Sequence, residues 1–264
     1  MAYQTGVINY KGSFKSIRNW KNAKDRKIYA GEKGGANRDL IMNNTAFKRT
    51  RENMAEFKGC GVAVKAIRHG LLHLIPEYTD TQFTARLVSI IKMINVRDEE
   101  GTRGTRAIYI SQNRAILSTL KLKEKRKIDF QLKRCITKNH PDSRTEATIT
   151  VNGFNPGPEF VPGKAQFYRV VNHLSIISDF AYSENTFGYA ALSPLSASST
   201  VVYSEYTVVN TPLSVALKAA FREGIVLNET HTVLQCIGIE FYIRSGIDGY
   251  VPYTTGSMMV YDVF

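Results

Sequence analysis

The sequence contains few cysteines and no long apolar run. Its three cysteines, Cys60, Cys135 and Cys236, lie far apart and form no C-x-x-C pair, so we expect free thiols in a reducing compartment. No run approaches the roughly 18 apolar residues that a membrane-spanning helix needs, and the first residues lack the apolar segment of a secretory signal. These absences predict a protein that is made in the cytoplasm without a membrane span and that could leave the cell on lysis as part of an assembly.

Sequence motifs of catalysis are missing as well. Gly34 and Gly35 follow Lys33 and precede no Ser or Thr, so they do not match a phosphate-binding loop. The chain has no G-x-S-x-G nucleophile elbow. His69 and His73 have the i, i+4 spacing of two metal ligands on a helix, but no third ligand is evident. We therefore expect no enzymatic activity, no cofactor and no metal site.

Acidic residues are scarce in the first half of the chain. Residues 1–140 hold 29 Lys and Arg against 12 Asp and Glu, a net charge of +17, whereas residues 141–264 hold 6 against 11, a net charge of −5. The basic half could bind a polyanion, either nucleic acid or an anionic membrane surface. It could instead contact the acidic half of another copy, or form a solvated face with no partner.

The N-terminal residues 3–30 are predicted to be extended and to form a β-hairpin with a polar turn at 22–25. Trp20 stands beside this turn, where it either packs on a neighbouring element or stacks on a nucleic-acid base. The tip of the hairpin is basic, and it supplies the first candidate contact residues for another subunit or a polyanion: Trp20, Lys21, Lys24, Arg26 and Lys27.

Helices are expected after the glycine break at 31–35. Asn37 is a candidate N-cap, and a second helix start is predicted at Asn44. Gly59 and Gly61 predict either a break in this second helix or the close approach of another backbone. Apolar residues recur at helical spacing on one face of it, namely Phe47, Met54, Phe57, Val64, Ile67, Leu71 and Leu74.

A second apolar helix is predicted over 83–94. With the first helix it would form a helical hairpin joined near Pro76. Residues 97–106 are predicted to be a loop and a candidate hinge.

The segment 47–57 combines aromatic side chains with dense charge. Glu52 and Glu56 alternate with the basic residues, which favours ion-pair networks and protein contact over a phosphate-binding track. The segment supplies the remaining candidate contact residues: Phe47, Lys48, Arg49, Arg51, Glu52 and Phe57.

The second half of the chain has the pattern of a β-protein. The basic stretch 121–138 is expected to contain a strand at 128–132, and 212–221 a short connecting helix. From residue 145 onward, extended segments alternate with Gly and Pro turns, which is typical of a β-sandwich. Tyrosines there would either pack across strands or serve a carbohydrate- or peptide-binding site: Tyr250, Tyr253 and Tyr261.

The sequence therefore predicts an α+β fold, in which an N-terminal β-hairpin and helical hairpin precede a C-terminal antiparallel β-sandwich. We place the boundary between a basic module of residues 1–120 and a sandwich-like domain of residues 121–264.

A motif in the N-terminal half supports this layout. EKGG at 32–35 is followed by Ile41, Asn43 and the segment AFKRTRENMAEF at 46–57. Together with the preceding basic hairpin and the late strand IGIEFY at 237–242, this pattern resembles a family of uncharacterised proteins of similar length from Bacteroidota. Cys60 departs from the family, which tends to have small residues other than cysteine there. The resemblance implies no activity or cofactor.

Two functions remain in competition at this point. The first is a non-enzymatic structural protein that assembles with copies of itself, through contacts between its basic N-terminal and acidic C-terminal parts, into an oligomer, filament or particle. The second is a nucleic-acid-binding protein that uses its basic N-terminal half.

Overall fold

The chain forms two compact units. The computed structural model describes residues 2–6, 9–72, 74–123, 127–246 and 249–264. Unit 1 is Met1–Arg51 and unit 2 is Glu52–Phe264. This division differs from the predicted boundary at 120/121, because the helices that follow residue 51 share a hydrophobic core with the sandwich strands.

Unit 1 contains a four-stranded antiparallel sheet in the order β1-β4-β3-β2. Its strands are β1 (Ala2–Tyr3), β2 (Gly12–Phe14), β3 (Ile17–Lys21) and β4 (Ile28–Glu32). Strands β3 and β4 form the predicted hairpin, with Trp20 paired to Tyr29. The backbone N–H of Asn22 closes the turn by donating to the Lys27 carbonyl (2.9 Å).

Asparagine side chains start the helices of unit 1, as predicted. Asn37 accepts from the Leu40 N–H at the N-terminus of α1 (Arg38–Asn43). Asn44 accepts from the Ala46 N–H at the start of η1 (Thr45–Phe47). Both side chains satisfy a backbone donor that the helix itself leaves unpaired.

Helix α2 (Lys48–Gly70) is continuous through both glycines. Gly59 faces the ring of Tyr189, so the close approach is made by a side chain and not by another backbone. The predicted apolar face is wrong in its first part, since Met54 and Phe57 are exposed. The buried face has helical spacing but includes charged and small residues: Glu56, Gly59, Cys60, Ala63, Val64, Ile67 and Gly70.

Helix α2 pairs with α4 (Phe83–Val96), and the short helix α3 (Ile75–Tyr78) lies between them. Arg68 near the end of α2 donates to Thr84 near the start of α4. Lys92, near the end of α4, donates to Glu56 in the first half of α2. The two helices therefore run in opposite directions and form the predicted helical hairpin.

Unit 2 also contains an antiparallel β-sandwich. Its larger sheet has the order β10-β7-β13-β14, with β11 paired to β7, and its smaller sheet has the order β12-β6-β5. The strands of the larger sheet are β7 (Phe167–Ser178), β10 (Ser199–Tyr203), β11 (Thr207–Val208), β13 (His231–Ser245) and β14 (Gly249–Val263). Those of the smaller sheet are β5 (Ile136–Asn139), β6 (Glu146–Phe154) and β12 (Leu213–Ala220). A separate hairpin consists of β8 (Phe180–Ser183) and β9 (Gly188–Ala191).

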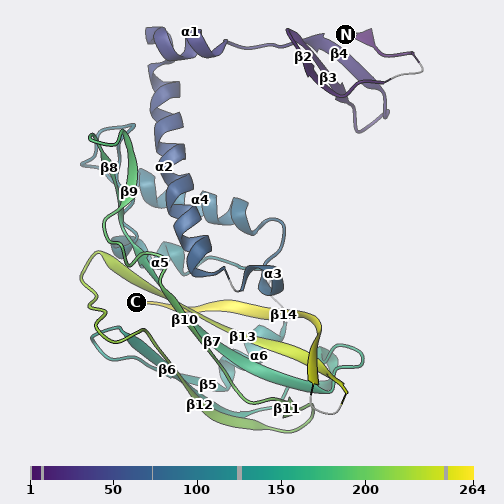
Figure 1. Ribbon diagram of the computed structural model, residues 1–264, viewed down its shortest axis with the longest axis vertical. Coiled ribbons are helices and arrows are strands. Elements are labelled where there is room, and N and C mark those ends of the chain that lie inside the picture. The colour runs from purple at the N-terminus through teal and green to yellow at the C-terminus, as the bar shows by residue number, and fades with distance from the viewer. Residues whose placement is uncertain (1, 7–8, 73, 124–126, 247–248) are drawn as a thin grey trace. The chain divides into compact units, whose positions relative to one another are not determined.

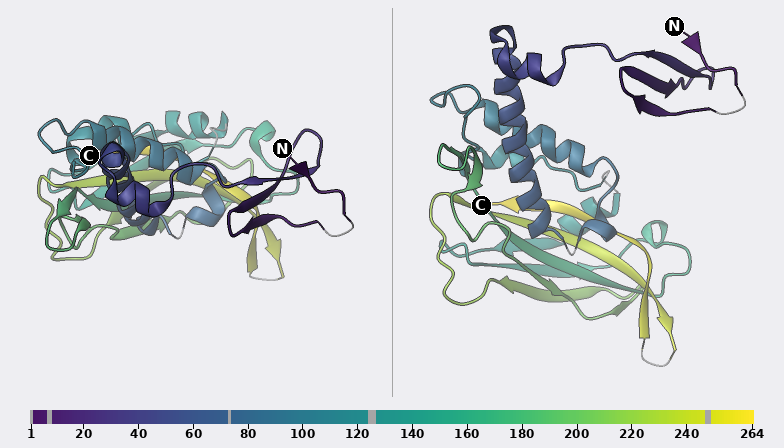
Figure 2. Two further views of the ribbon diagram at one scale, coloured as in Figure 1. Left: turned by 90° about the horizontal axis from the view of Figure 1, so that it is seen from above. Right: turned by 45° about the horizontal axis from the view of Figure 1, so that its top comes forward.

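Unit 2 has three layers. Helices α2, α4 and α5 (Arg114–Leu117) lie on one side of the larger sheet, and the smaller sheet lies on the other (Figures 1 and 2). One core packs the helices against Val171, Leu234 and Met258 of the larger sheet. A second core lies between the two sheets and includes Phe154 and Ile237. Strands β7 and β13 are consequently buried on both faces.

Two short segments differ from the sequence prediction. The strand expected at 128–132 is part of helix α6 (Lys127–Arg134), in which Ile128 and Leu132 are buried one turn apart while Phe130 is exposed. The helix expected at 212–221 is strand β12, which pairs with β6 along its length. The remaining short elements are η2 (Ser111–Asn113) and η3 (Pro158–Phe160).

The two glycines of α2 should respond in opposite ways to the same substitution. A Cβ at Gly59 would lie 2.5 Å from the Tyr189 ring, so Gly59→Ala should destabilise the protein by about 1–3 kcal/mol. Gly61 has open space around it, so Gly61→Ala should stabilise the helix by up to about 1 kcal/mol. Urea unfolding of both variants measures the difference, and equal stabilities would contradict the packing of β9 on α2.

Candidate interaction surfaces

The described part of unit 1 has no hydrophobic core. None of residues 3–6 and 9–51 is buried, although this segment includes a four-stranded sheet. A sheet normally stabilises itself by burying one face against another layer. The apolar side chains of unit 1 are therefore available to a surface outside the unit.

One face of the unit 1 sheet forms an apolar groove of about 620 Å³. Phe14 and Ile17 are opposite each other on β2 and β3, and both are exposed. Tyr10 also lines the groove. Gln4 fixes one wall by donating to the side chain of Asn19 (2.8 Å) while it accepts from the backbone N–H of Tyr10 (2.9 Å).

The opposite face of this sheet is aromatic. Trp20 stacks on Tyr29 with 6.2 Å between the ring centroids, and the indole also contacts Gly31. Lys27 lies 4.5 Å from the centre of the Tyr3 ring. Trp20 thus packs within its own sheet, whereas the side chains of Lys21, Lys24 and Arg26 are exposed at the hairpin tip.

The candidate residues at the start of α2 have different surroundings. Arg51 donates to the carbonyl oxygens of Ile41 (2.7 Å) and Asn44 (2.8 Å), so it satisfies carbonyl groups around the end of α1. Phe47 is half-buried, and Lys48 and Arg49 are exposed. Glu52 belongs to unit 2 and forms an ion pair with Arg103 (3.6 Å).

Phe57 contributes to a second apolar groove, which lies within unit 2. This Phe57 groove has a volume of about 640 Å³ between α2 and α4. Phe57, Met93 and Val96 line it and are all more than half exposed. Lys92 and Arg97 add positive charge to its lining. The groove therefore combines apolar area with basic side chains.

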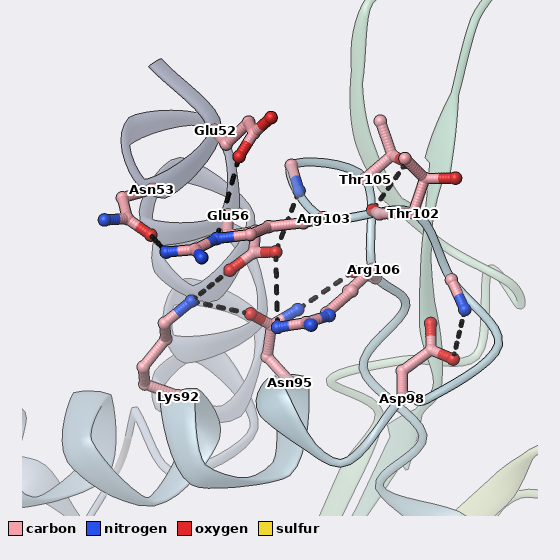
Figure 3. Close-up of polar contacts among 12 residues, drawn as sticks. Glu52, Asn53, Glu56, Lys92, Asn95, Asp98, Thr102, Arg103, Thr105 and Arg106 are labelled. Atoms are coloured by element: carbon pink, nitrogen blue, oxygen red, sulfur yellow. Dashed lines mark hydrogen bonds and ion pairs between the residues drawn. The ribbon is translucent and has the colours of Figure 1, made fainter. Parts of the chain in front are cut away.

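A buried carboxylate holds α2 and α4 together beside this groove (Figure 3). The side chain of Glu56 is only 2% exposed. It accepts from Lys92 of α4 (2.5 Å) and from the backbone N–H of Gly104 (2.9 Å), and Arg106 lies 3.9 Å away. Asn95 accepts a further hydrogen bond from Lys92 and donates to the Arg106 carbonyl. Glu56 thus connects two helices and the loop at 97–106.

The same loop is fixed at a second point. Asp98 accepts from the backbone N–H groups of Gly101 (2.9 Å) and Ala107 (2.6 Å). Tyr189 of β9 donates to the Arg106 carbonyl, which links the loop to the β8–β9 hairpin. The candidate hinge is therefore anchored from both sides. Lys92, Asn95 and Arg106 were not among the candidate residues predicted from the sequence.

The environment of Glu56 lowers the pKa of its carboxyl group. Burial alone would raise this pKa, but the hydrogen bonds from Gly104 and Lys92 and the nearby positive charges outweigh it. The cysteines behave differently, because burial raises the pKa of Cys60 to about 11 and that of Cys236 to about 12. Both thiols remain protonated at neutral pH, as expected for buried cysteines.

The three candidate tyrosines of the sandwich differ: Tyr250 packs against other aromatic rings, Tyr261 donates to the Ile136 carbonyl and Tyr253 is exposed. Tyr250 stacks on Tyr206 with 3.9 Å between the ring centroids. Arg169 pairs with Glu240 (2.5 Å) and lies 3.9 Å from the Tyr203 ring centre. For Tyr250, these contacts favour packing between side chains of the sandwich over a carbohydrate- or peptide-binding site.

Two other candidate features, the basic stretch and the histidine pair, include residues outside the described ranges. The basic stretch 121–138 includes residues 124–126, and the histidine pair includes His73, all of which lie outside the described residues. Lys138 within that stretch pairs with Asp262. Across the described ranges, no three His, Cys, Asp or Glu side chains are placed to hold one metal ion.

Removing the Glu56 charge should destabilise unit 2 in a pH-dependent way. Because its folded pKa is lowered, the charge stabilises the fold above the ordinary carboxyl pKa of about 4.3, and this is lost as the pH falls through the folded pKa. Glu56→Gln should cost about 2–3 kcal/mol at pH 7 and progressively less below pH 4. Denaturant unfolding across pH measures this, with exposed Glu100→Gln as the control. If the stability difference between Glu56→Gln and wild type does not shrink in acid, the stabilising role of the Glu56 charge is contradicted.

The comparisons with known proteins add no relative. No family model, no curated protein and no solved structure matches the chain, so the resemblance to the Bacteroidota family stays a prediction. In the part of the chain that the structure describes, no helix combines the length and apolar character needed to cross a membrane.

Proposed function

We propose that this chain is a non-enzymatic structural protein that assembles with copies of itself. In this assembly, the basic unit 1 of one copy docks on the acidic sandwich of the next. The single observation that carries the proposal is the sheet of unit 1, which has apolar side chains on both faces and no buried residue among residues 3–6 and 9–51.

Docking would supply the burial that unit 1 lacks. Four short strands that face water on both sides gain little hydrophobic stabilisation to offset the entropy of ordering them. A partner surface in the groove would cover Tyr10, Phe14 and Ile17. We therefore expect unit 1 to be stabilised when copies associate.

Charge favours a second copy as the partner. Unit 1 holds 12 Lys and Arg against 3 Asp and Glu, a net charge of +9, whereas residues 141–264 have a net charge of −5. Several acidic side chains of the sandwich are exposed, among them Asp142, Glu159, Glu205, Glu223 and Glu229. Complementary charges steer association and select the correct surfaces.

The docking surfaces differ, so each copy would use one to contact the copy before it and the other to contact the copy after it. Such heterologous contacts build rings when the rotation closes and filaments when it does not. Edge strands offer a further contact, because β2 and β14 lie at the edges of their sheets and could pair with a strand of a neighbour.

Assembly should depend on the unit 1 groove. In nuclease-treated protein at low salt, light scattering after size exclusion should reveal species much larger than the 29.7 kDa chain, and electron micrographs should show them to be regular. Replacing Phe14 and Ile17 by Asp should raise the concentration needed for large species at least tenfold, because charge would enter the groove. Leu72→Asp is the control, since it changes an exposed apolar side chain of unit 2 that follows α2 and lies outside the sandwich. A wild-type protein that stays monomeric at high concentration would exclude self-assembly.

Nucleic-acid binding is the alternative, and the exposed cations of the hairpin tip favour it. Lys24 and Arg26 occupy a tight turn with their side chains in solvent, where they could contact phosphates. If this alternative holds, a Lys24→Glu, Arg26→Glu variant should lose affinity for DNA or RNA and show a shallower salt dependence. If assembly holds instead, nuclease-treated wild-type protein should associate without nucleic acid. Titration of both proteins with labelled DNA and RNA separates the two functions.

A further inference from the structure

No described side chain of unit 2 fills the Phe57 groove. Phe57 is 60% exposed, and Val88 and Met93 line the groove beside it. One turn further along α2, Gly61 leaves open space where any other residue would place a Cβ. The Tyr189 ring leaves no room for a side chain at position 59, which explains the glycine there. No contact within the described residues explains the glycine at position 61. An element from outside could therefore approach α2 closely here.

The charge of this groove defines the chemistry of its occupant. Lys92 is already paired with Glu56, but Arg97 in the lining and Lys58 on α2 are exposed. Neither Arg97 nor Lys58 has a side-chain partner among the described residues. The occupant should accordingly present an apolar side chain close to a carboxylate.

The tip of the β8–β9 hairpin has this chemistry. Phe187 is 80% exposed, and Glu184 lies in the same turn, where its carbonyl accepts from the Phe187 N–H (3.3 Å). Phe187 has a φ of 46°, a left-handed conformation that bulky residues rarely adopt. The hairpin is held in place by the Tyr189 hydrogen bond to Arg106 and by the pairing of Ile108 with Phe180.

The β8–β9 hairpin of a copy does not face the Phe57 groove of the same copy. Gly59 faces Tyr189 of the hairpin, and Phe57 lies two residues away on α2, about 200° around a helix of 3.6 residues per turn. The hairpin and the groove consequently occupy opposite sides of α2. Figure 1 shows the β8–β9 hairpin beside α2 within unit 2.

We propose that the Phe187 tip of one copy inserts into the Phe57 groove of a second copy, with Glu184 facing Arg97 and Lys58. This inference rests on the proposed self-assembly and names one of its contacts. Because tip and groove are different surfaces, the contact is heterologous and can be repeated from copy to copy.

Disulfide trapping tests this contact with little disturbance of either surface. Thr186→Cys places a thiol beside Phe187, and Ser89→Cys places one in the groove, both at exposed positions. In a Cys135→Ser background, a chain with both cysteines should form a ladder of linked multimers on mild oxidation. A mixture of the two single-cysteine chains should stop at a linked dimer that contains one of each.

Two controls decide the outcome. Ala216→Cys, an exposed position on β12, replaces Thr186→Cys to measure random collision. Adding Phe187→Asp should reduce the Thr186–Ser89 crosslink at least tenfold, whereas adding Leu72→Asp should leave it unchanged. Crosslinking no greater than with Ala216→Cys, or a yield insensitive to Phe187→Asp, overturns this contact.

The light-scattering mass of the wild-type protein distinguishes the two levels of failure. A large wild-type species that lacks the specific crosslink would overturn the tip–groove contact and retain self-assembly. A wild-type monomer at every concentration would overturn both.

Discussion

The pairing of β7 with β13 is the constraint on which unit 2 depends. The two strands stay in register from Ser178 opposite His231 to Phe167 opposite Tyr242, and both are buried on two faces. A slip of one residue would move every side chain to the wrong layer. Asn172 strengthens this specificity, because its amide donates to the carbonyls of Ala147 and Leu217 in the smaller sheet. A slipped register would leave those buried polar groups unpaired, which is costly in a dry core.

The helices complete this framework through polar contacts. Glu56 could not be buried alone, so its bonds to Lys92 and Gly104 are a condition of packing α2 against α4 and the loop. The Tyr189 hydroxyl group then joins the β8–β9 hairpin to the same loop. The Phe57 groove and the hairpin tip are thereby held within one packed unit. A directional contact between copies needs this rigidity, because two mobile surfaces would lose more entropy on binding.

Sequence patterns revealed those features that depend on local physics. The caps at Asn37 and Asn44, the basic hairpin and the long strands follow from side-chain chemistry and period. The predictions for residues 127–134 and 213–220 were wrong because such short segments fit both the helical and the strand period. Tertiary packing decides between the two structures. The buried face of α2 was missed in part because Glu56 and Gly59 belong to it. Phe57 remains a predicted contact residue, and its exposure depends on the side of α2 to which β9 packs.

Unit 1 explains why charge and apolar area have to act together in the proposed assembly. Its exposed groove would promote indiscriminate association if the unit were neutral. A net charge of +9 makes two copies of unit 1 repel each other, so their apolar faces are kept apart. In the proposed assembly, the acidic sandwich of another copy would remove this repulsion and offer a surface that covers the groove. If unit 1 gains its burial only there, as we propose, stabilisation of unit 1 and growth of the assembly would be a single, coupled event.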